Sequence, residues 1–248
     1  MPNRIAPKLL AEFIGTFALI FIGAGATAVV GDGVGLPGIA AIAFAHGLTI
    51  MVFAFAYGSV SGGHMNPAVT VGVLAAGAMD VGEAIGYIVS QLVGGVAGAF
   101  FLAVVLGGAK TGLGVPVLAH NLALGATSLT ITPAAGFLIE AVLAFFLVTV
   151  VLSTAVAGRA GNLAPLAIGM TLTLNIIMGG ALTGAAFNPA RALGPMVATG
   201  NFTDAWLYVT APIVGAVVAA VVHAGLARLA QERTAPAERG SAAGTPAE

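Results

Sequence analysis

Two segments of the sequence combine residue types that can act on a small polar molecule. Each is an asparagine followed by a proline and an alanine. Asparagine caps helix N-termini, and proline favours the first helical position. The first N–H groups of such a helix have no partner within it, and they face outward with the positive end of the helix dipole. The segments Asn66-Pro67-Ala68 and Asn188-Pro189-Ala190, called the two boxes below, can therefore donate hydrogen bonds to a neutral molecule and repel cations.

Three charged side chains lie inside stretches that are otherwise apolar: Glu12, Glu140 and Arg191. A charge within a membrane is costly unless it faces a cavity or a partner, so each is a functional candidate. For Arg191 the alternative is a side chain that reaches the membrane face, but its place in the first turn after Asn188 favours a deep site. The glutamates have two alternative roles, proton relay and loop support. We favour loop support, because each precedes a glycine-rich loop whose backbone donors need an acceptor.

These residues must be held by helices that cross a membrane. Hydrophobic residues make up 59% of the 248 residues and charged residues only 7%, whereas soluble domains carry roughly 25% charged residues. A spanning helix needs about 20 apolar residues, and only about ten follow each box. We therefore predict an all-α membrane protein with six transmembrane helices and two re-entrant half helices. The expected spans are 8–30, 38–57, 82–106, 133–157, 163–180 and 204–229, and the expected half helices are 66–77 and 188–198.

An odd number of spans in each half means that the second half is inserted upside down relative to the first, an arrangement typical of transporters and channels. We predict one channel domain over residues 1–230, with inverted repeats at about 6–106 and 133–230 and a linker at 107–132. Residues 231–248 contain almost no large apolar side chains and are expected to be disordered. Most basic residues share the side of the termini, which predicts a multi-pass protein of the cell membrane with both termini cytoplasmic.

The composition argues against several other classes of protein. A net charge of −1 with scattered basic residues gives no nucleic-acid footprint. The absence of cysteine removes thiolate metal sites and cysteine nucleophiles. Four histidines without clustered acids make no metal site, and no catalytic triad, phosphate-binding loop or catalytic carboxylate pair is present in the sequence. We therefore expect no enzyme activity, no cofactor and no bound metal.

The sequence also resembles a known family. The paired boxes, the opening segment Ala11-Glu12-Phe13-Ile14-Gly15-Thr16-Phe17, the stretch Ser61-Gly62-Gly63-His64 and Arg191 together resemble an aquaporin of the major intrinsic protein family over about residues 6–225. The resemblance implies a homotetramer in membrane lipid, with a pore for water and small neutral solutes in each copy. It places the boxes in the pore and Arg191 in the narrowest constriction, and it implies that Glu12 and Glu140 support the loops. His64 is expected in the cytoplasmic vestibule.

The family's selectivity filter has four positions at fixed distances from the boxes, which here are His46, Ile176, Ala185 and Arg191. Typical water-selective members have phenylalanine first and histidine second, and this sequence departs from both. The set resembles the tonoplast intrinsic subfamily, whose pores are linked with water and ammonia. Ala192 stands where glycerol facilitators usually carry aspartate. Val209 stands where water channels commonly have tryptophan. This departure leaves the permeation of larger neutral solutes as an open alternative.

Three functions are therefore compatible with the sequence. The favoured one is a passive channel for water, and also for ammonia, that excludes ions and protons. The second is a channel for larger neutral solutes such as glycerol or urea. The third, a coupled secondary transporter, is less favoured because the sequence offers no obvious site for a coupling ion.

Overall fold

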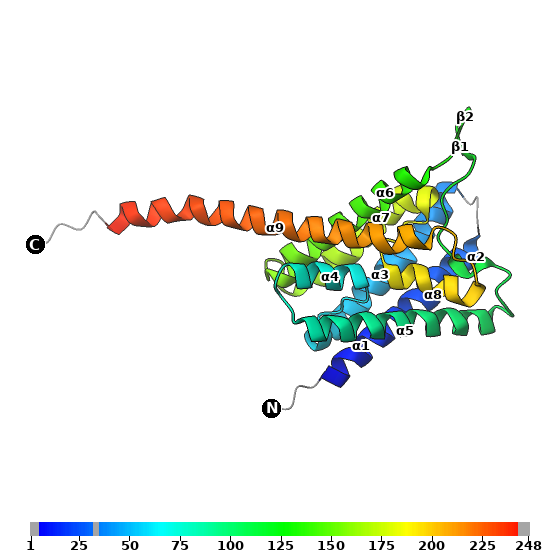
Figure 1. Cartoon of the computed structure of the whole chain (residues 1–248), viewed down its shortest axis with the longest axis horizontal. Helices are drawn as coiled ribbons and strands as arrows, with labels where there is room; N and C mark the ends of the chain where they lie inside the picture. The colour runs from blue at the N-terminus through cyan, green and yellow to red at the C-terminus, as the bar shows by residue number, and fades with distance from the viewer. Residues whose placement is uncertain (1–4, 32–34, 243–248) are drawn as a thin grey trace, which may run out of the picture.

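The computed structural model describes residues 5–31 and 35–242, which are helical apart from loops and one short hairpin. Figure 1 shows the helices packed side by side, with one long helix that extends beyond the rest. The elements in chain order are α1 (Ile5–Ala18), the π-helix η1 (Leu19–Ala24), α2 (Gly25–Val30), α3 (Gly35–Ser61), α4 (Pro67–Ala75), α5 (Val81–Val105), η2 (Gly112–Gly114), β1 (Leu122–Leu124), β2 (Thr127–Leu129), α6 (Pro133–Val151), the π-helix η3 (Leu152–Val156), η4 (Gly161–Leu163), α7 (Ala164–Thr183), α8 (Pro189–Thr199) and α9 (Ala205–Ala242).

Within the described part of the chain, six helical segments are long and apolar enough to cross a membrane. They are Ile5–Val30, Pro37–Ser61, Val81–Val105, Pro133–Val156, Gly161–Thr183 and Ala205–Ala230. The prediction of six spans is therefore confirmed. The observed ends differ from the expected ones by at most four residues: the first span begins earlier, at Ile5, and the second and fifth continue to Ser61 and Thr183. In both cases a glycine with positive φ follows, Gly62 or Gly184, and a left-handed glycine is a common helix end.

Two short helices, α4 and α8, follow the boxes. Asn66 caps α4 by accepting a hydrogen bond from the Ala68 N–H. Asn188 caps α8 by accepting from the N–H groups of Ala190 and Arg191. In Figure 1 the two helices lie nearly on one line. Their lengths of 9 and 11 residues are half of what a bilayer requires, as expected for re-entrant half helices.

The packing of the helices repeats between the two halves. In the first half α1 packs along α5, and in the second half α6 packs along α9. The half helices cross over, because α8 packs on α5 and α4 packs on α9. The pair α3 and α7 joins the two halves. Each half therefore encloses the half helix of the other, which is the packing that inverted repeats produce.

Glycines let these helices approach closely, among them Gly47, Gly94, Gly98 and Gly169. A Cβ atom on Gly94 would lie 2.5 Å from the Phe13 carbonyl oxygen. A Cβ on Gly215, in the matching place between α6 and α9, would lie 2.0 Å from the Ala141 oxygen. Such contacts are far inside van der Waals range. A side chain at these positions would push the helices apart.

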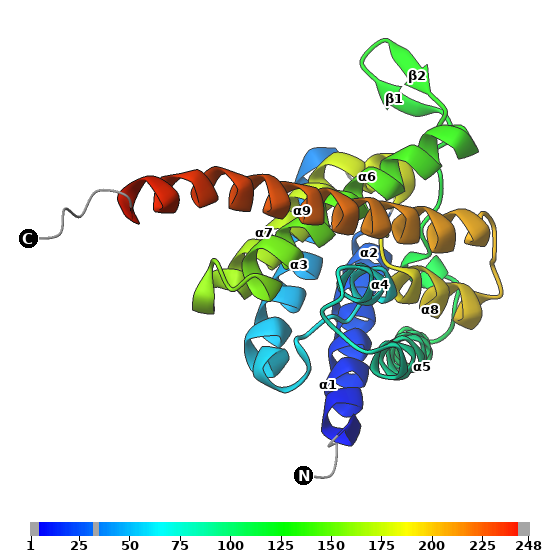
Figure 2. The same ribbon diagram turned by 60° about the vertical axis from the view of Figure 1, so that its left-hand side comes forward.

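The linker between the halves is partly ordered by short elements. Its hairpin pairs β1 with β2 in antiparallel register, with Leu122 opposite Leu129. Figure 2 shows the hairpin projecting from the helices, away from both chain ends. His120, just before the hairpin, is exposed.

The tail requires a correction. Residues from 231 onward were expected to be disordered, but α9 continues as a helix to Ala242. The last span has already nucleated this helix, so it continues to Ala242 although the segment contains Pro236 and Gly240, which are poor helix formers. Residues 243–248 lie outside the described part of the chain.

Candidate permeation pathway

The two boxes are bonded to each other across the centre of the molecule. The Asn66 side-chain amide donates to the Phe187 carbonyl at 3.1 Å. The Asn188 amide donates to the Met65 carbonyl at 2.9 Å. Each acceptor is the residue that precedes the other box. Because the N-termini of α4 and α8 are fixed against each other in this way, the positive ends of both helix dipoles converge on one point.

Each box asparagine has a second N–H that these bonds do not use. A side-chain amide carries two donor hydrogens, and the crossed bonds take one from Asn66 and one from Asn188. The amide oxygens are occupied by the N–H groups of their own half helices. The remaining group that each asparagine can offer to a passing molecule is therefore a donor. A water that accepts from these donors presents only its own hydrogens to neighbouring waters.

Glu12 holds the loop that leads to the first box. Its Oε1 accepts from the Ser61 hydroxyl at 2.7 Å and from the His64 N–H at 2.9 Å. Its Oε2 accepts from the Met65 N–H at 2.6 Å and from the Gln91 amide at 2.7 Å. The carboxylate is completely buried, and every bond that it makes fixes the loop or the neighbouring helix α5.

Glu140 occupies the equivalent place in the second half. It accepts from the Thr183 hydroxyl at 2.6 Å and from the Ala186 N–H at 3.0 Å. Its other oxygen accepts from the Phe187 N–H. Phe187 has φ +29 and Met65, its counterpart, has φ +48. Residues with side chains rarely adopt such angles, so the carboxylates hold both loops in a strained backbone conformation.

Two tyrosines add a symmetric pair of contacts that the sequence analysis did not identify. The Tyr87 hydroxyl donates to the Ser61 carbonyl, and the Tyr208 hydroxyl donates to the Thr183 carbonyl, both at 2.7 Å. Both rings are buried. The signal was present in the sequence, because each tyrosine follows its box by about the same number of residues. Gln91, which also bonds the Thr70 hydroxyl, has no such counterpart, since Pro212 takes the equivalent place in the second half.

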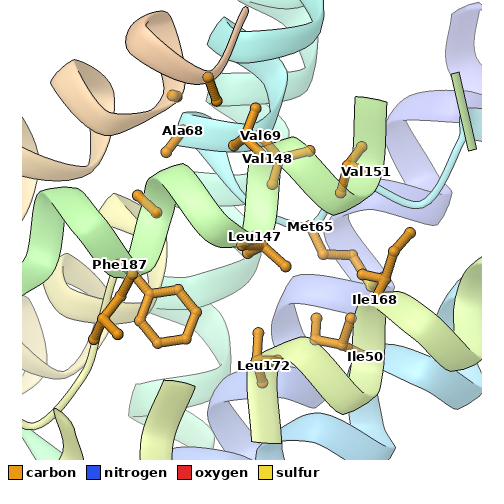
Figure 3. Packing of buried hydrophobic residues seen from close by; sticks show 14 of the residues in the cluster. Ile50, Met65, Ala68, Val69, Leu147, Val148, Val151, Ile168, Leu172 and Phe187 are labelled. Atoms are coloured by element: carbon orange, nitrogen blue, oxygen red, sulfur yellow. The ribbon is translucent and has the colours of Figure 1, made fainter. Parts of the chain in front are cut away.

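A narrow cavity leads to the boxes. It has a volume of about 20 Å³ and is lined by both box asparagines, His64 and apolar side chains of α3, α6 and α7. Figure 3 shows Ile50, Leu147 and Leu172 around this space. The volume accommodates about one water molecule. The wall is mostly apolar, and its polar side chains are His64 and the two box asparagines.

This cavity continues into a wide vestibule of about 1120 Å³. His64 lines both the cavity and the vestibule, and its Nδ1 lies 3.1 Å from the Thr70 hydroxyl. The vestibule is on the side of the chain termini, because Lys8 at the start of α1 also lines it. His64 thus lies at the inner end of the vestibule.

The four expected filter residues are all buried. His46 and Arg191 are 2% and 3% exposed, Ile176 is 3% exposed and Ala185 is 1% exposed. The His46 ring lies against Gly23, and Arg191 is bonded to Gly114, which contacts the neighbouring residue Ala24, so the two polar residues are held by the same turn. Ile176 and Ala185 belong to one apolar cluster with Leu143 and Phe187. The site therefore has a polar side and an apolar side.

The hydrogen bonds of His46 and Arg191 show which donors and acceptors on the polar side are already used. His46 Nδ1 lies 2.9 Å from the Ile42 carbonyl. A carbonyl only accepts, so Nδ1 carries the hydrogen, and Nε2 of the neutral ring is an acceptor. Arg191 donates from one terminal nitrogen to the Gly114 carbonyl at 2.7 Å. Among the described residues, His46 Nε2 and Arg191 Nε have no hydrogen-bond partner. The polar side thus combines an unpartnered acceptor on His46 with N–H groups of Arg191 that the bond to Gly114 does not use.

Gly114 supports Arg191, one of the expected filter residues, and sequence reasoning missed it. It lies in η2, within the linker, and its carbonyl holds Arg191. A Cβ on Gly114 would lie 2.5 Å from the Ala24 carbonyl oxygen, and its φ is +70. The position therefore requires glycine. A backbone acceptor leaves no residue-type signal, so nothing in the linker sequence marked it.

Six spans in inverted halves, two half helices braced end to end and a narrow cavity that reaches them define a membrane channel. The chain matches the model of the family described as major intrinsic protein over residues 3–223 and belongs to that family. The predicted aquaporin-like fold is confirmed, and the protein is a passive channel rather than an enzyme.

Individual relatives support the same conclusion. The chain is 36% identical to Aquaporin TIP2-1 of Arabidopsis thaliana over 222 residues, which cover 86% of this chain and 84% of the relative. It is 39% identical over 218 residues to Glycerol uptake facilitator protein-like 6 of Lactiplantibacillus plantarum, with 86% and 94% covered. Its structure matches the aquaglyceroporin from Plasmodium falciparum with a TM-score of 0.71 and 25% identity, over 87% of this chain and 94% of that one.

Proposed function

We propose that this channel conducts water and ammonia and excludes ions and protons. The observation that carries the proposal is the combination of an unpartnered acceptor on His46 with the N–H donors of Arg191 that the bond to Gly114 does not use. Water and ammonia can each accept from Arg191 and donate to His46. Ammonium has no lone pair for Arg191 and is repelled by its permanent charge.

The boxes account for the exclusion of ions. Converging helix dipoles and asparagine donors repel cations at the centre of the pore, a device described in general for aquaporin-type channels. Each water that accepts from Asn66 or Asn188 is prevented from accepting a proton from its neighbour. In this proposal Glu12 and Glu140 support the loops and do not carry protons, because the bonds described above use both oxygens of each.

The proposal is tested by measuring solute fluxes in proteoliposomes. We expect water flux by light scattering, ammonia flux by internal pH change, and little glycerol flux, because the His46 ring obstructs a larger solute. His46→Phe should lower ammonia flux by about tenfold and water flux by less, since it removes the acceptor that donor solutes use. Phe44→Leu, which changes a half-exposed residue two positions away on α3, is the matched control and should behave as wild type.

Two results would count against this proposal. If wild-type vesicles shrink faster than empty ones but take up ammonia no faster, the filter assignment is wrong. A glycerol flux comparable to the water flux would favour the second candidate function, a channel for larger neutral solutes. That candidate is supported by the apolar side of the filter, at Ile176 and Ala185, and by the similarity to a protein named as a glycerol uptake facilitator.

We also propose that both termini face the cytoplasm of the cell membrane. Lys8 lines the vestibule, Arg159 lies between the vestibule-lining residues Val156 and Gly161, and Arg228 lies near the C-terminal end of the sixth span. This placement agrees with the positive-inside rule. The chain has no cysteine, so a single introduced cysteine reports its own location. We expect Ser128→Cys, in the exposed hairpin, to react with an impermeant thiol reagent on intact cells. Ala157→Cys, exposed at the opposite end, should react only after lysis, and the reverse pattern would contradict the topology.

The family resemblance further supports a homotetramer in lipid, with one pore in each copy. The many exposed apolar side chains on the outer helix faces, such as Phe100, Phe101 and Val104, provide surfaces for lipid and for neighbouring copies. Mass measurement of the protein in mild detergent is expected to give four chains. A conducting monomer as the sole species would contradict this assembly.

A further inference from the structure

The π-helical turn η1, residues Leu19–Ala24, packs against the polar side of the filter, which is formed by His46 and Arg191. A Cβ atom built on Gly23 would lie 2.6 Å from Cδ2 of His46, 2.8 Å from its Cγ and 2.9 Å from its Nε2. These three atoms belong to the same imidazole ring, so the ring lies directly against the Gly23 backbone. Carbon atoms in ordinary contact are about 3.5–4.0 Å apart. The ring therefore occupies space that any other residue at position 23 would fill.

The next residue of the same turn supports Arg191. The Ala24 carbonyl is in close contact with Gly114, at a distance that excludes a side chain, and the Gly114 carbonyl accepts from Arg191. One turn of the first span thus supports both polar filter residues, His46 directly and Arg191 through Gly114. π-helical turns are rare and frequently occur at functional sites. Here the turn brings Gly23 and Ala24 against two different partners.

We propose that Gly23 is a specificity-determining positioning residue of the channel: by lacking a side chain it lets the His46 ring lie back against η1, which sets the position of the free Nε2 acceptor in the filter. This inference rests on the proposed function. His46 is held at a second point by the bond from Nδ1 to the Ile42 carbonyl. A methyl group at position 23 would move the ring by about 1 Å and strain or break that bond. The position of Nε2 in the filter would then change.

The test compares Gly23→Ala with Gly225→Ala. Gly225 lies within helix α9, and a Cβ there has no atom within 4 Å, so its substitution changes helix propensity without a contact. For Gly23→Ala we expect the ratio of ammonia flux to water flux to fall about fivefold, the effect of one strained side-chain rotamer. Gly225→Ala should leave the ratio unchanged. An unchanged ratio in folded Gly23→Ala protein would overturn the proposal.

A second arm shows whether the effect acts through His46. In a His46→Ala background the ring is absent, so Gly23→Ala should cause no further change in the flux ratio or in the thermal unfolding midpoint. If Gly23→Ala alone fails to fold, the double variant should recover the fold. A double variant that fails equally, or a ratio that falls again in the His46→Ala background, would show that Gly23 serves another contact and would overturn the proposal.

The two proposals fail in distinguishable ways. If wild-type protein moves no neutral solute, the proposed function fails. The thermal arm then still tests the contact, because Gly23→Ala should lower the unfolding midpoint in the presence of His46 and not in its absence. If wild type conducts water and ammonia while Gly23→Ala keeps the same ratio and the same midpoint, the function stands and the role of Gly23 is wrong.

Discussion

Replacing Asn188 with aspartate is expected to make the channel leak cations. The change removes the amide that donates to the Met65 carbonyl and places a carboxylate where two helix dipoles supplied a positive focus. At a separation of about 4 Å and an effective dielectric constant of about 20, a unit charge changes an ion's energy by about 4 kcal/mol. We therefore expect sodium permeability of reconstituted protein to rise at least about tenfold, measured by a sodium-sensitive dye inside vesicles.

A second buried asparagine provides the control. Asn175 also donates its side-chain amide to a carbonyl, that of Leu143 at 2.8 Å, and it is also buried, but it is not part of a box. Asn175→Asp removes the same kind of bond and adds the same charge at a different place. It should lower stability without the sodium leak. Equal leaks from Asn175→Asp and Asn188→Asp would refute the role assigned to the boxes.

Replacing Glu140 with glutamine is expected to destabilise the protein strongly. Glu140 accepts three hydrogen bonds from the second loop, and glutamine has one acceptor oxygen where the carboxylate has two. Its NH₂ group would face the Phe187 N–H, so two donors would meet in a buried place. A buried donor without a partner costs about 1–3 kcal/mol. A lower thermal unfolding midpoint in detergent and loss of water flux are the expected results.

Glu83→Gln is the matched control for this substitution. Glu83 pairs with Lys8 at 2.7 Å, and both side chains are partly exposed, at 23% and 36%. Ion pairs of this kind contribute about 0–1 kcal/mol, so the midpoint should hardly change. The alternative role of Glu140, proton relay, makes the opposite prediction: Glu140→Gln would be as stable as Glu83→Gln, and only proton flux would differ from wild type.

The sequence allowed the spans and half helices to be predicted because their signals are local. A stretch of apolar residues reports a span, and Asn66-Pro67 or Asn188-Pro189 reports a capped helix start wherever it occurs in a fold. The sizes of the half helices followed from the short apolar runs after each box. Even the inverted arrangement followed from simple counting, because three spans in each half leave the second half upside down.

What holds the site together could not be predicted in the same way. The partners of Asn66 and Asn188 are the carbonyls of Phe187 and Met65, and every residue has a carbonyl. Arg191 is likewise held by a backbone carbonyl, that of Gly114. The contact between Gly23 and His46 depends on the phase of a π-helical turn, which composition and hydropathy do not encode. These features exist only once distant segments have been brought together.

The reciprocal bonds between the boxes also bear on the order in which the channel is made. Asn66 has its partner 121 residues further along the chain, at Phe187. At a synthesis rate of about 5–20 residues per second, that partner emerges roughly 6–24 s later. Until then the first re-entrant loop is held by Glu12 within its own half, while its central amide lacks a protein acceptor. The contact between the two boxes is thus completed late in biogenesis, and a chain cut between the halves should regain it only when both fragments meet in one membrane.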